Sequence, residues 1–106
     1  MNADSLDRAV QGCYYVVHTA SPFPAVNPRD ENDLIKPAVE GTLAVMRAAH
    51  KHKVKRVVIT SSVAAIMFHT PANRKPEYNE SDWSELQGCG AYEKSKLLAE
   101  KAAWDF

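Results

Sequence analysis

The spacing of apolar residues along this chain predicts two long amphipathic helices. From Glu31 to about His52 the apolar positions recur at steps of mainly three and four: Leu34, Ile35, Ala38, Val39, Leu43, Met46 and Ala49. A similar pattern over Gly90–Phe106 predicts a second helix, entered from the turn at residues 88–90. Pro37 lies in the first turn of the earlier helix or bends it, and Gly41 leaves room for another element to approach closely.

Two short runs of β-branched and aromatic residues predict strands. Tyr14–His18 and Arg56–Thr60 are apolar without clean alternation, which is typical of strands buried on both faces of a parallel sheet. A short helix is expected before the first strand, with Asp4 or Ser5 as its N-cap and Gly12 at its end.

The remaining segments are rich in prolines and polar residues. Three prolines predict an irregular segment up to Asp30, and His69–Tyr78 is expected to be a surface loop. Asn79–Glu85 is interpreted as a capped turn that begins a short helix. The order helix, strand, long helix, strand, long loop, helix predicts an α/β fold, as a piece of a doubly wound parallel sheet.

Composition narrows the possible functions. Among 106 residues, 13 basic side chains balance 13 acidic ones, so there is no basic field for nucleic acid. The chain shows neither a membrane span nor a signal-peptide pattern, and a cytoplasmic location is expected. Cys13 and Cys89 stand far apart and are interpreted as reduced thiols, while His50 and His52 diverge on a helix. No metal site is expected.

Tyr92 and Lys96 form the main chemical candidate. Side chains four residues apart share one face of a helix. A lysine ammonium near a phenol favours the phenolate and lowers the tyrosine pKa, which suits general acid/base catalysis. The alternative is that the two residues decorate a solvated helix face by chance.

Polar residues follow both predicted strands. Residues 19–21, Thr-Ala-Ser, come after the first strand, and Ser61 and Ser62 come after the second. Ligands of open α/β sheets bind outside the carboxyl ends of the strands, so these residues are candidates for a binding site. The alternative is a plain polar exit from each strand.

The run Tyr-x-x-x-Lys-Leu-Leu-Ala-Glu-Lys-Ala-Ala-Trp-Asp-Phe, with the His-Thr-Ala-Ser-Pro turn and the Ile-Thr-Ser-Ser-Val-Ala strand end, resembles the extended short-chain dehydrogenases/reductases. Within this NAD-dependent epimerase/dehydratase superfamily, the similarity is to the dihydroflavonol reductase-like branch. The resemblance implies a Rossmann-type sheet and an NAD(P) cofactor, with NADP(H) favoured over NAD(H), and no metal. The residue that separates NADP from NAD in this family lies outside the chain. The catalytic residues that it implies are Ser62, Tyr92 and Lys96. The cofactor-binding residues that it implies are Thr19, Ala20, Ser21, Ser61, Tyr92 and Lys96.

In this family, Tyr92 would be the acid/base, Lys96 its pKa tuner and a ligand of the nicotinamide ribose, and Ser62 the group that orients the substrate carbonyl. The implied reaction is reduction of a ketone or aldehyde, or its reverse, on a small molecule. Sugar-nucleotide epimerisation or dehydration on the same triad is an alternative, as is a non-catalytic truncated product. A homodimer through the two long helices is also expected.

The resemblance also indicates what the chain omits. Residues 1–106 correspond to the central part of one NAD(P)-binding Rossmann domain, without the first βαβ unit, its G-x-x-G-x-x-G loop and the C-terminal substrate region. The chain alone is therefore expected to be inactive. Met67 stands where dihydroflavonol reductases place an amide, and residues 86–90 lack the Lys-Asn-Trp-Tyr run of cinnamoyl-CoA reductases. Neither substrate is implied.

Overall fold

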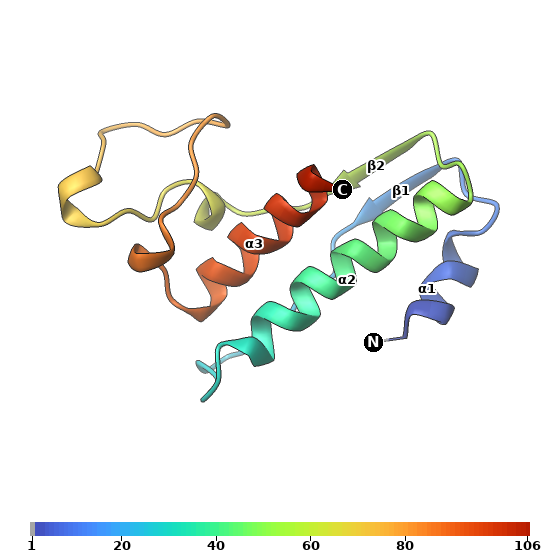
Figure 1. Ribbon diagram of the computed structural model, residues 1–106, viewed down its shortest axis with the longest axis horizontal. Helices are drawn as coiled ribbons and strands as arrows, with labels where there is room; N and C mark the ends of the chain where they lie inside the picture. The colour runs from blue at the N-terminus through green and yellow to red at the C-terminus, as the bar shows by residue number, and fades with distance from the viewer. Residues whose placement is uncertain (1) are drawn as a thin grey trace.

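The computed structural model describes residues 2–106, which form helices on a small parallel sheet (Figure 1). The α-helices of this region are α1 (Ala3–Val10), α2 (Asn32–Lys51) and α3 (Ala91–Asp105), and its strands are β1 (Tyr15–His18) and β2 (Arg56–Ile59). Short 3₁₀ helices follow β2: η1 (Val63–Ala65), η2 (Pro71–Asn73) and η3 (Leu86–Gly88). The predicted α/β class and element order are confirmed.

The two strands pair in parallel and are joined through α2. Tyr15 lies opposite Arg56, and His18 lies opposite Ile59. Beyond the last pair, the Thr60 N–H donates to the His18 carbonyl oxygen at 2.9 Å. Both strands therefore end at the same edge of the sheet, and the residues that follow them begin side by side.

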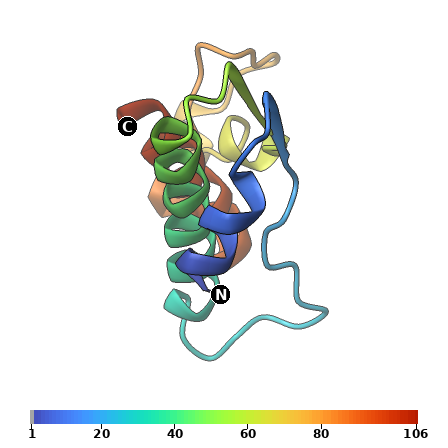
Figure 2. The same ribbon diagram turned by 90° about the vertical axis from the view of Figure 1, so that its right-hand side faces the viewer.

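One face of the sheet carries the core. Val16 and Val57 pack against a buried cluster in which α1 supplies Val10 and α2 supplies Ala48 and Ala49. Figure 2 shows α2 and α3 on the same side of the strands. The helix side of the sheet is thus covered by the chain itself.

The opposite face is open, so the prediction of strands buried on both faces is wrong for this chain. The exposed fractions of Tyr15, Val17 and Val58 are 67, 68 and 52%. The residue types suit cover on either side, but residues 2–106 place helices against one side only.

The helix ends differ in detail from the predicted ones. α1 is capped by Asn2, whose Oδ1 accepts from the Asp4 N–H at 2.9 Å, so neither Asp4 nor Ser5 is the cap. Gly12 follows the helix with φ of +82°, a conformation that favours glycine. Pro37 lies in the second turn of α2 rather than the first, and the helix continues through it.

The short helix expected to begin within residues 79–85 is absent. Asn79 does form a capped turn, in which its Oδ1 accepts from the Ser81 N–H at 2.9 Å. The chain then pairs with the segment after β2, because the N–H groups of Ser84 and Glu85 donate to the Ala65 and Phe68 carbonyls at 2.8 Å each. These non-local bonds override the local helix signal, and η3 forms only afterwards.

Candidate active site

α3 places the tyrosine and the lysine at the carboxyl edge of the sheet. Tyr92 and Lys96 lie one turn apart, and Glu100 follows at the same spacing. The apolar side of α3 packs against α2 and η1, and this packing draws Lys96 inward until only 9% of the residue is exposed. Its Nζ lies 3.5 Å from the Thr60 carbonyl oxygen, which accepts a hydrogen bond.

The two serines after β2 have different partners. The Ser61 hydroxyl donates to a carboxylate oxygen of Glu100 on α3. Ser62 is the N-cap of η1, and its Oγ accepts from the Ala64 N–H at 3.1 Å. Since that bond uses a lone pair of Ser62, its hydroxyl proton stays available to a substrate oxygen.

A small hollow lies where the strand ends meet α3. Four of the predicted site residues line it: Ala20, Ser21, Ser61 and Lys96. His18, Thr42 and Glu100 line it as well. Its volume is about 20 Å³, which is the size of one water molecule. A larger hollow of about 380 Å³ shares His18, Ala20 and Ser21 and extends to Pro37 and Gly41 on α2.

The other predicted site residues lie outside both hollows. Thr19 is exposed, and Ser62 and Tyr92 line neither space. The ring of Tyr92 instead forms a T-shaped pair with that of Phe23 from the β1–α2 segment, with ring centroids 5.1 Å apart. The structure therefore groups the predicted cofactor-side residues, apart from Thr19 and Tyr92, and within residues 2–106 it shows no hydrogen bond between Ser62 and Tyr92.

Sequence reasoning missed Glu100, His18 and Phe23 as members of this region. Glu100 could have been found, because it repeats the four-residue spacing of Tyr92 and Lys96. His18 directly precedes the candidate residues at the end of β1, and that position was the signal that could have identified it. Nothing in the sequence signalled Phe23, which reaches Tyr92 from an irregular segment 69 positions away.

His18 is the group in this region whose titration is perturbed. Burial, and then the positive charge of Lys96, lower its pKa below the ordinary value for histidine. Its Nε2 lies 3.5 Å from the hydroxyl oxygen of Thr42 on α2. A neutral imidazole and a buried lysine therefore stand together at the end of β1.

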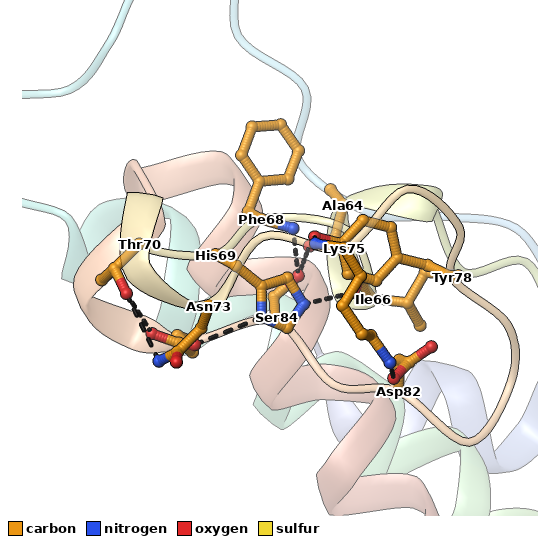
Figure 3. A network of polar contacts seen from close by, with 11 residues as sticks. Ala64, Ile66, Phe68, His69, Thr70, Asn73, Lys75, Tyr78, Asp82 and Ser84 are labelled. Carbon is orange, nitrogen blue, oxygen red and sulfur yellow. Dashed lines mark hydrogen bonds and ion pairs between the residues drawn. The ribbon is translucent and has the colours of Figure 1, made fainter.

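The loop between Ser62 and Tyr92 is anchored by a buried serine (Figure 3). Ser84 is 5% exposed, and its hydroxyl donates to the Ala64 carbonyl oxygen at 2.7 Å. The Ser84 Oγ in turn accepts from the Phe68 N–H at 3.0 Å. Ser84 thus ties the segment before α3 to the segment after β2.

A second anchor of this loop is His69, which stacks on Tyr78 with ring centroids 4.7 Å apart. Its Nε2 lies 2.9 Å from the Ile66 carbonyl oxygen, and its Nδ1 lies 3.3 Å from Glu85 Oε1. Burial raises the pKa of Glu85, but hydrogen bonds, among them those from Thr70 and His69, outweigh it and hold the pKa below the usual range. The loop is therefore ordered by side-chain contacts rather than by regular secondary structure.

Within residues 2–106 the structure shows no cluster of three or more histidine, cysteine or acidic side chains placed to hold a metal ion. In the same region, no helix has both the length and the apolar character that crossing a membrane requires.

The family described as "3-beta hydroxysteroid dehydrogenase/isomerase family" matches residues 1–105. The chain is 42% identical to tetraketide alpha-pyrone reductase 1 of Arabidopsis thaliana, with all of this chain and 34% of that protein aligned. It is 38% identical to the bifunctional dihydroflavonol 4-reductase/flavanone 4-reductase of Malus domestica, over 96% of this chain and 31% of that protein. The chain thus spans about a third of the length of these relatives.

Solved structures of reductases share its fold. Yeast methylglyoxal/isovaleraldehyde reductase Gre2, complexed with NADPH, superposes with a TM-score of 0.78 at 36% identity, over 98% of this chain and 34% of that one. Gre2 from Candida albicans, also in complex with NADPH, gives a TM-score of 0.74 at 34% identity, over 97% and 33% of the two chains.

Proposed function

Because this chain belongs to the 3-beta hydroxysteroid dehydrogenase/isomerase family of extended short-chain dehydrogenases/reductases, we propose that it forms the catalytic centre of a reductase. The reaction is NADPH-dependent reduction of a ketone or aldehyde to an alcohol, or its reverse. Relatives of this chain are about three times its length, so the activity is proposed for a protein of that length that contains it. We call that protein the full-length reductase.

The observation that carries the proposal is the buried lysine at the strand ends. Lys96 has three N–H donors, and within residues 2–106 the acceptor described for it is the Thr60 carbonyl oxygen at 3.5 Å. A buried ammonium needs further acceptors, and the hydroxyl oxygens of a ribose are suitable ones. The hollow beside it, lined by Ala20, Ser21 and Ser61, supports placing the cofactor flank there.

The proposed roles follow from the chemistry of each side chain. Tyr92 donates its phenolic proton to the carbonyl oxygen of the substrate, and Ser62 donates a hydrogen bond to the same oxygen. Lys96 contributes the positive charge that stabilises the phenolate left on Tyr92. NADPH, when bound, supplies the hydride. The alcohol product then leaves, and a proton from water restores Tyr92.

Reduction is favoured over epimerisation or dehydration of sugar nucleotides by the relatives themselves. The two curated relatives and both solved structures described above are named as reductases, and the two structures hold NADPH. The cofactor is therefore proposed to be NADP(H). The proposed substrate is a small-molecule ketone or aldehyde. Because Met67 and residues 86–90 depart from the patterns of dihydroflavonol and cinnamoyl-CoA reductases, the substrate of neither group is proposed.

The test is Tyr92→Phe in the full-length reductase, assayed with NADPH and a panel of ketones and aldehydes. Removing the proton donor should lower kcat by about 10²- to 10⁴-fold while the Kd for NADPH changes little. Tyr14→Phe is the matched control. Tyr14 stands directly before β1 and is 71% exposed, so this substitution makes the same chemical change outside the site. Full turnover of Tyr92→Phe at neutral pH would exclude Tyr92 as the acid.

We also propose that the full-length reductase forms a homodimer through α2 and α3. The two helices pack against each other, and the last turn of α3 exposes Trp104 by 76%. Sedimentation at micromolar concentration should show a dimer, and Trp104→Glu should shift it towards the monomer. A strict monomer for the unmodified protein would contradict this proposal.

A further inference from the structure

Glu100 connects the candidate active site to the last turn of α3. It lines the small hollow together with Ser61 and Lys96. Each of its carboxylate oxygens has a donor: the Ser61 hydroxyl donates to Oε2, and Trp104 Nε1 donates to Oε1 at 3.3 Å. The carboxylate is therefore held from two sides, by the end of β2 and by its own helix.

The hydrogen bond from Ser61 to Glu100 determines whether the Ser61 hydroxyl can donate to a ligand or accept from it. A serine hydroxyl has one proton and two lone pairs, and a carboxylate can only accept. Since the proton of Ser61 is committed to Glu100, the hydroxyl presents lone pairs to the hollow. Lys96, which also lines the hollow, presents only donors. The hollow thus combines the lone pairs of Ser61 with the cation of Lys96, beside the Glu100 carboxylate.

We propose that Glu100 is a positioning residue that holds Ser61 as a hydrogen-bond acceptor for a donor group of the cofactor, either a hydroxyl or an amide N–H. The inference rests on the proposed function, because it assigns the cofactor to this hollow. It goes further by giving Ser61 a direction of hydrogen bonding and by naming the side chain that imposes it.

A purely structural role for Glu100 would be a staple between β2 and α3. Either role is compatible with a neutral acceptor in place of the carboxylate, since an amide oxygen can also accept the serine proton. A charged acceptor makes the hydrogen bond stronger, which fixes the hydroxyl proton more firmly. The positioning role predicts a raised KM for NADPH with kcat little changed. A purely structural role does not confine the effect to that KM.

The experiment compares Ser61→Ala, Glu100→Ala and the double variant in the full-length reductase. Each single variant should raise the KM for NADPH by about five- to tenfold, the size expected for one lost hydrogen bond, with kcat within about twofold. Because Glu100 acts through Ser61, the double variant should cost no more than Ser61→Ala alone. Glu40→Ala, the same truncation at an exposed position of α2, should leave the KM unchanged.

Glu100→Gln is the second variant, because it preserves the size of the side chain and one acceptor oxygen. Its KM for NADPH should stay within about twofold of the unmodified value. The inference is overturned by additive effects of Ser61→Ala and Glu100→Ala, by a loss confined to kcat, or by a Gln variant as impaired as the Ala variant. These outcomes are distinguishable from failure of the proposed function. The proposed function fails if Tyr92→Phe keeps its turnover.

Discussion

At the residue scale, the surroundings of His18 lower its pKa. Burial and the Lys96 charge lower its pKa in the folded state, so the unfolded chain takes up a proton at higher pH than the folded chain does. Folding stability should therefore fall as the pH drops through the ordinary histidine value of about 6.5, and the loss should end below the folded-state pKa. Above that window His18 is neutral in both states.

His18→Gln removes this proton uptake while keeping a polar side chain next to Thr42. The free energy of unfolding of the full-length reductase, measured by urea titration at pH 8 and pH 5, should fall less for the variant than for the unmodified protein. An equal or larger fall in the variant would show that His18 is not a source of acid sensitivity. Because other groups titrate in both proteins, the difference between the two falls is the quantity to compare.

Also at the residue scale, the absence of a side chain at Gly88 lets the backbone there lie close to the backbone of His69, in the loop between Ser62 and Tyr92. A Cβ at this position would lie 2.9 Å from the backbone carbon of His69, a distance that requires the backbone to shift. Gly88→Ala should therefore destabilise the protein by roughly 1–3 kcal/mol, as overpacking does. Hydrogen exchange should accelerate in residues 66–88 and stay unchanged in α2.

Gly12→Ala is the comparison for Gly88→Ala, because nothing lies within 4 Å of its added Cβ and the cost arises from φ of +82°. That cost should be about 1–2 kcal/mol, and its effect on exchange should be confined to α1 and β1. Equal exchange patterns in the two glycine variants would contradict the close approach at His69.

At the element scale, the carboxylate of Asp7 and the side chain of Val10 both join α1 to the rest of the chain. Asp7 accepts from Lys51 Nζ at 3.0 Å and lies 3.1 Å from His52 Nε2, while Val10 packs under α2. The hydrogen bond from Lys51 is the largest cause of the lowered pKa of Asp7, and its charge and His52 add to it. Since the folded-state pKa is depressed, the contribution of Asp7 is present above its ordinary pKa and is lost as the pH falls through the folded-state value.

Asp7→Asn should loosen α1 without unfolding the rest. Amides of residues 4–10 should exchange a few-fold faster at neutral pH, a small effect because exposed ion pairs contribute little. The difference between variant and unmodified protein should shrink as the pH falls through the lowered folded-state pKa of Asp7, because the carboxyl group is then protonated. Faster exchange throughout α2 would instead show that α1 supports the whole fold.

At the scale of the whole molecule, the chain exposes more surface than a compact protein of its mass. Its accessible surface is 7322 Å², whereas a compact monomer of 11.8 kDa exposes about 5,900 Å². The radius of gyration is 14.9 Å, against roughly 13 Å for a compact domain of this length. The buried apolar residues of the described region are mostly alanines, and both edges of the two-stranded sheet lack a neighbouring strand there.

The 106-residue chain on its own should therefore melt without a sharp transition and bind NADPH no tighter than millimolar. A thin core cannot offset the conformational entropy of the chain, and exposed strand faces favour association. Thermal melts followed by circular dichroism, with calorimetric titration of NADPH, test both parts. The full-length reductase is the positive control, and a sharp two-state melt together with micromolar binding by the chain alone would contradict the prediction.

Local residue patterns were sufficient to predict the elements and the family of this chain. The apolar spacing of α2 and α3, the β-branched runs of the strands and the interval between Tyr92 and Lys96 each depend on residues within one or two turns of each other. Such local patterns survive in any tertiary context that buries one face of the element. They were therefore readable before the structure, to within a few residues at each end.

Which of these residues contact one another depends instead on tertiary packing. The bond from Ser61 to Glu100 joins positions 39 apart, and the charge of Lys96 reaches His18 across two elements. The Asn79 cap failed to start a helix because Ser84 was bonded instead to the segment after β2. Contacts of this kind depend on how the helices and strands pack in three dimensions. A pattern of neighbouring residue types carries no information about that packing.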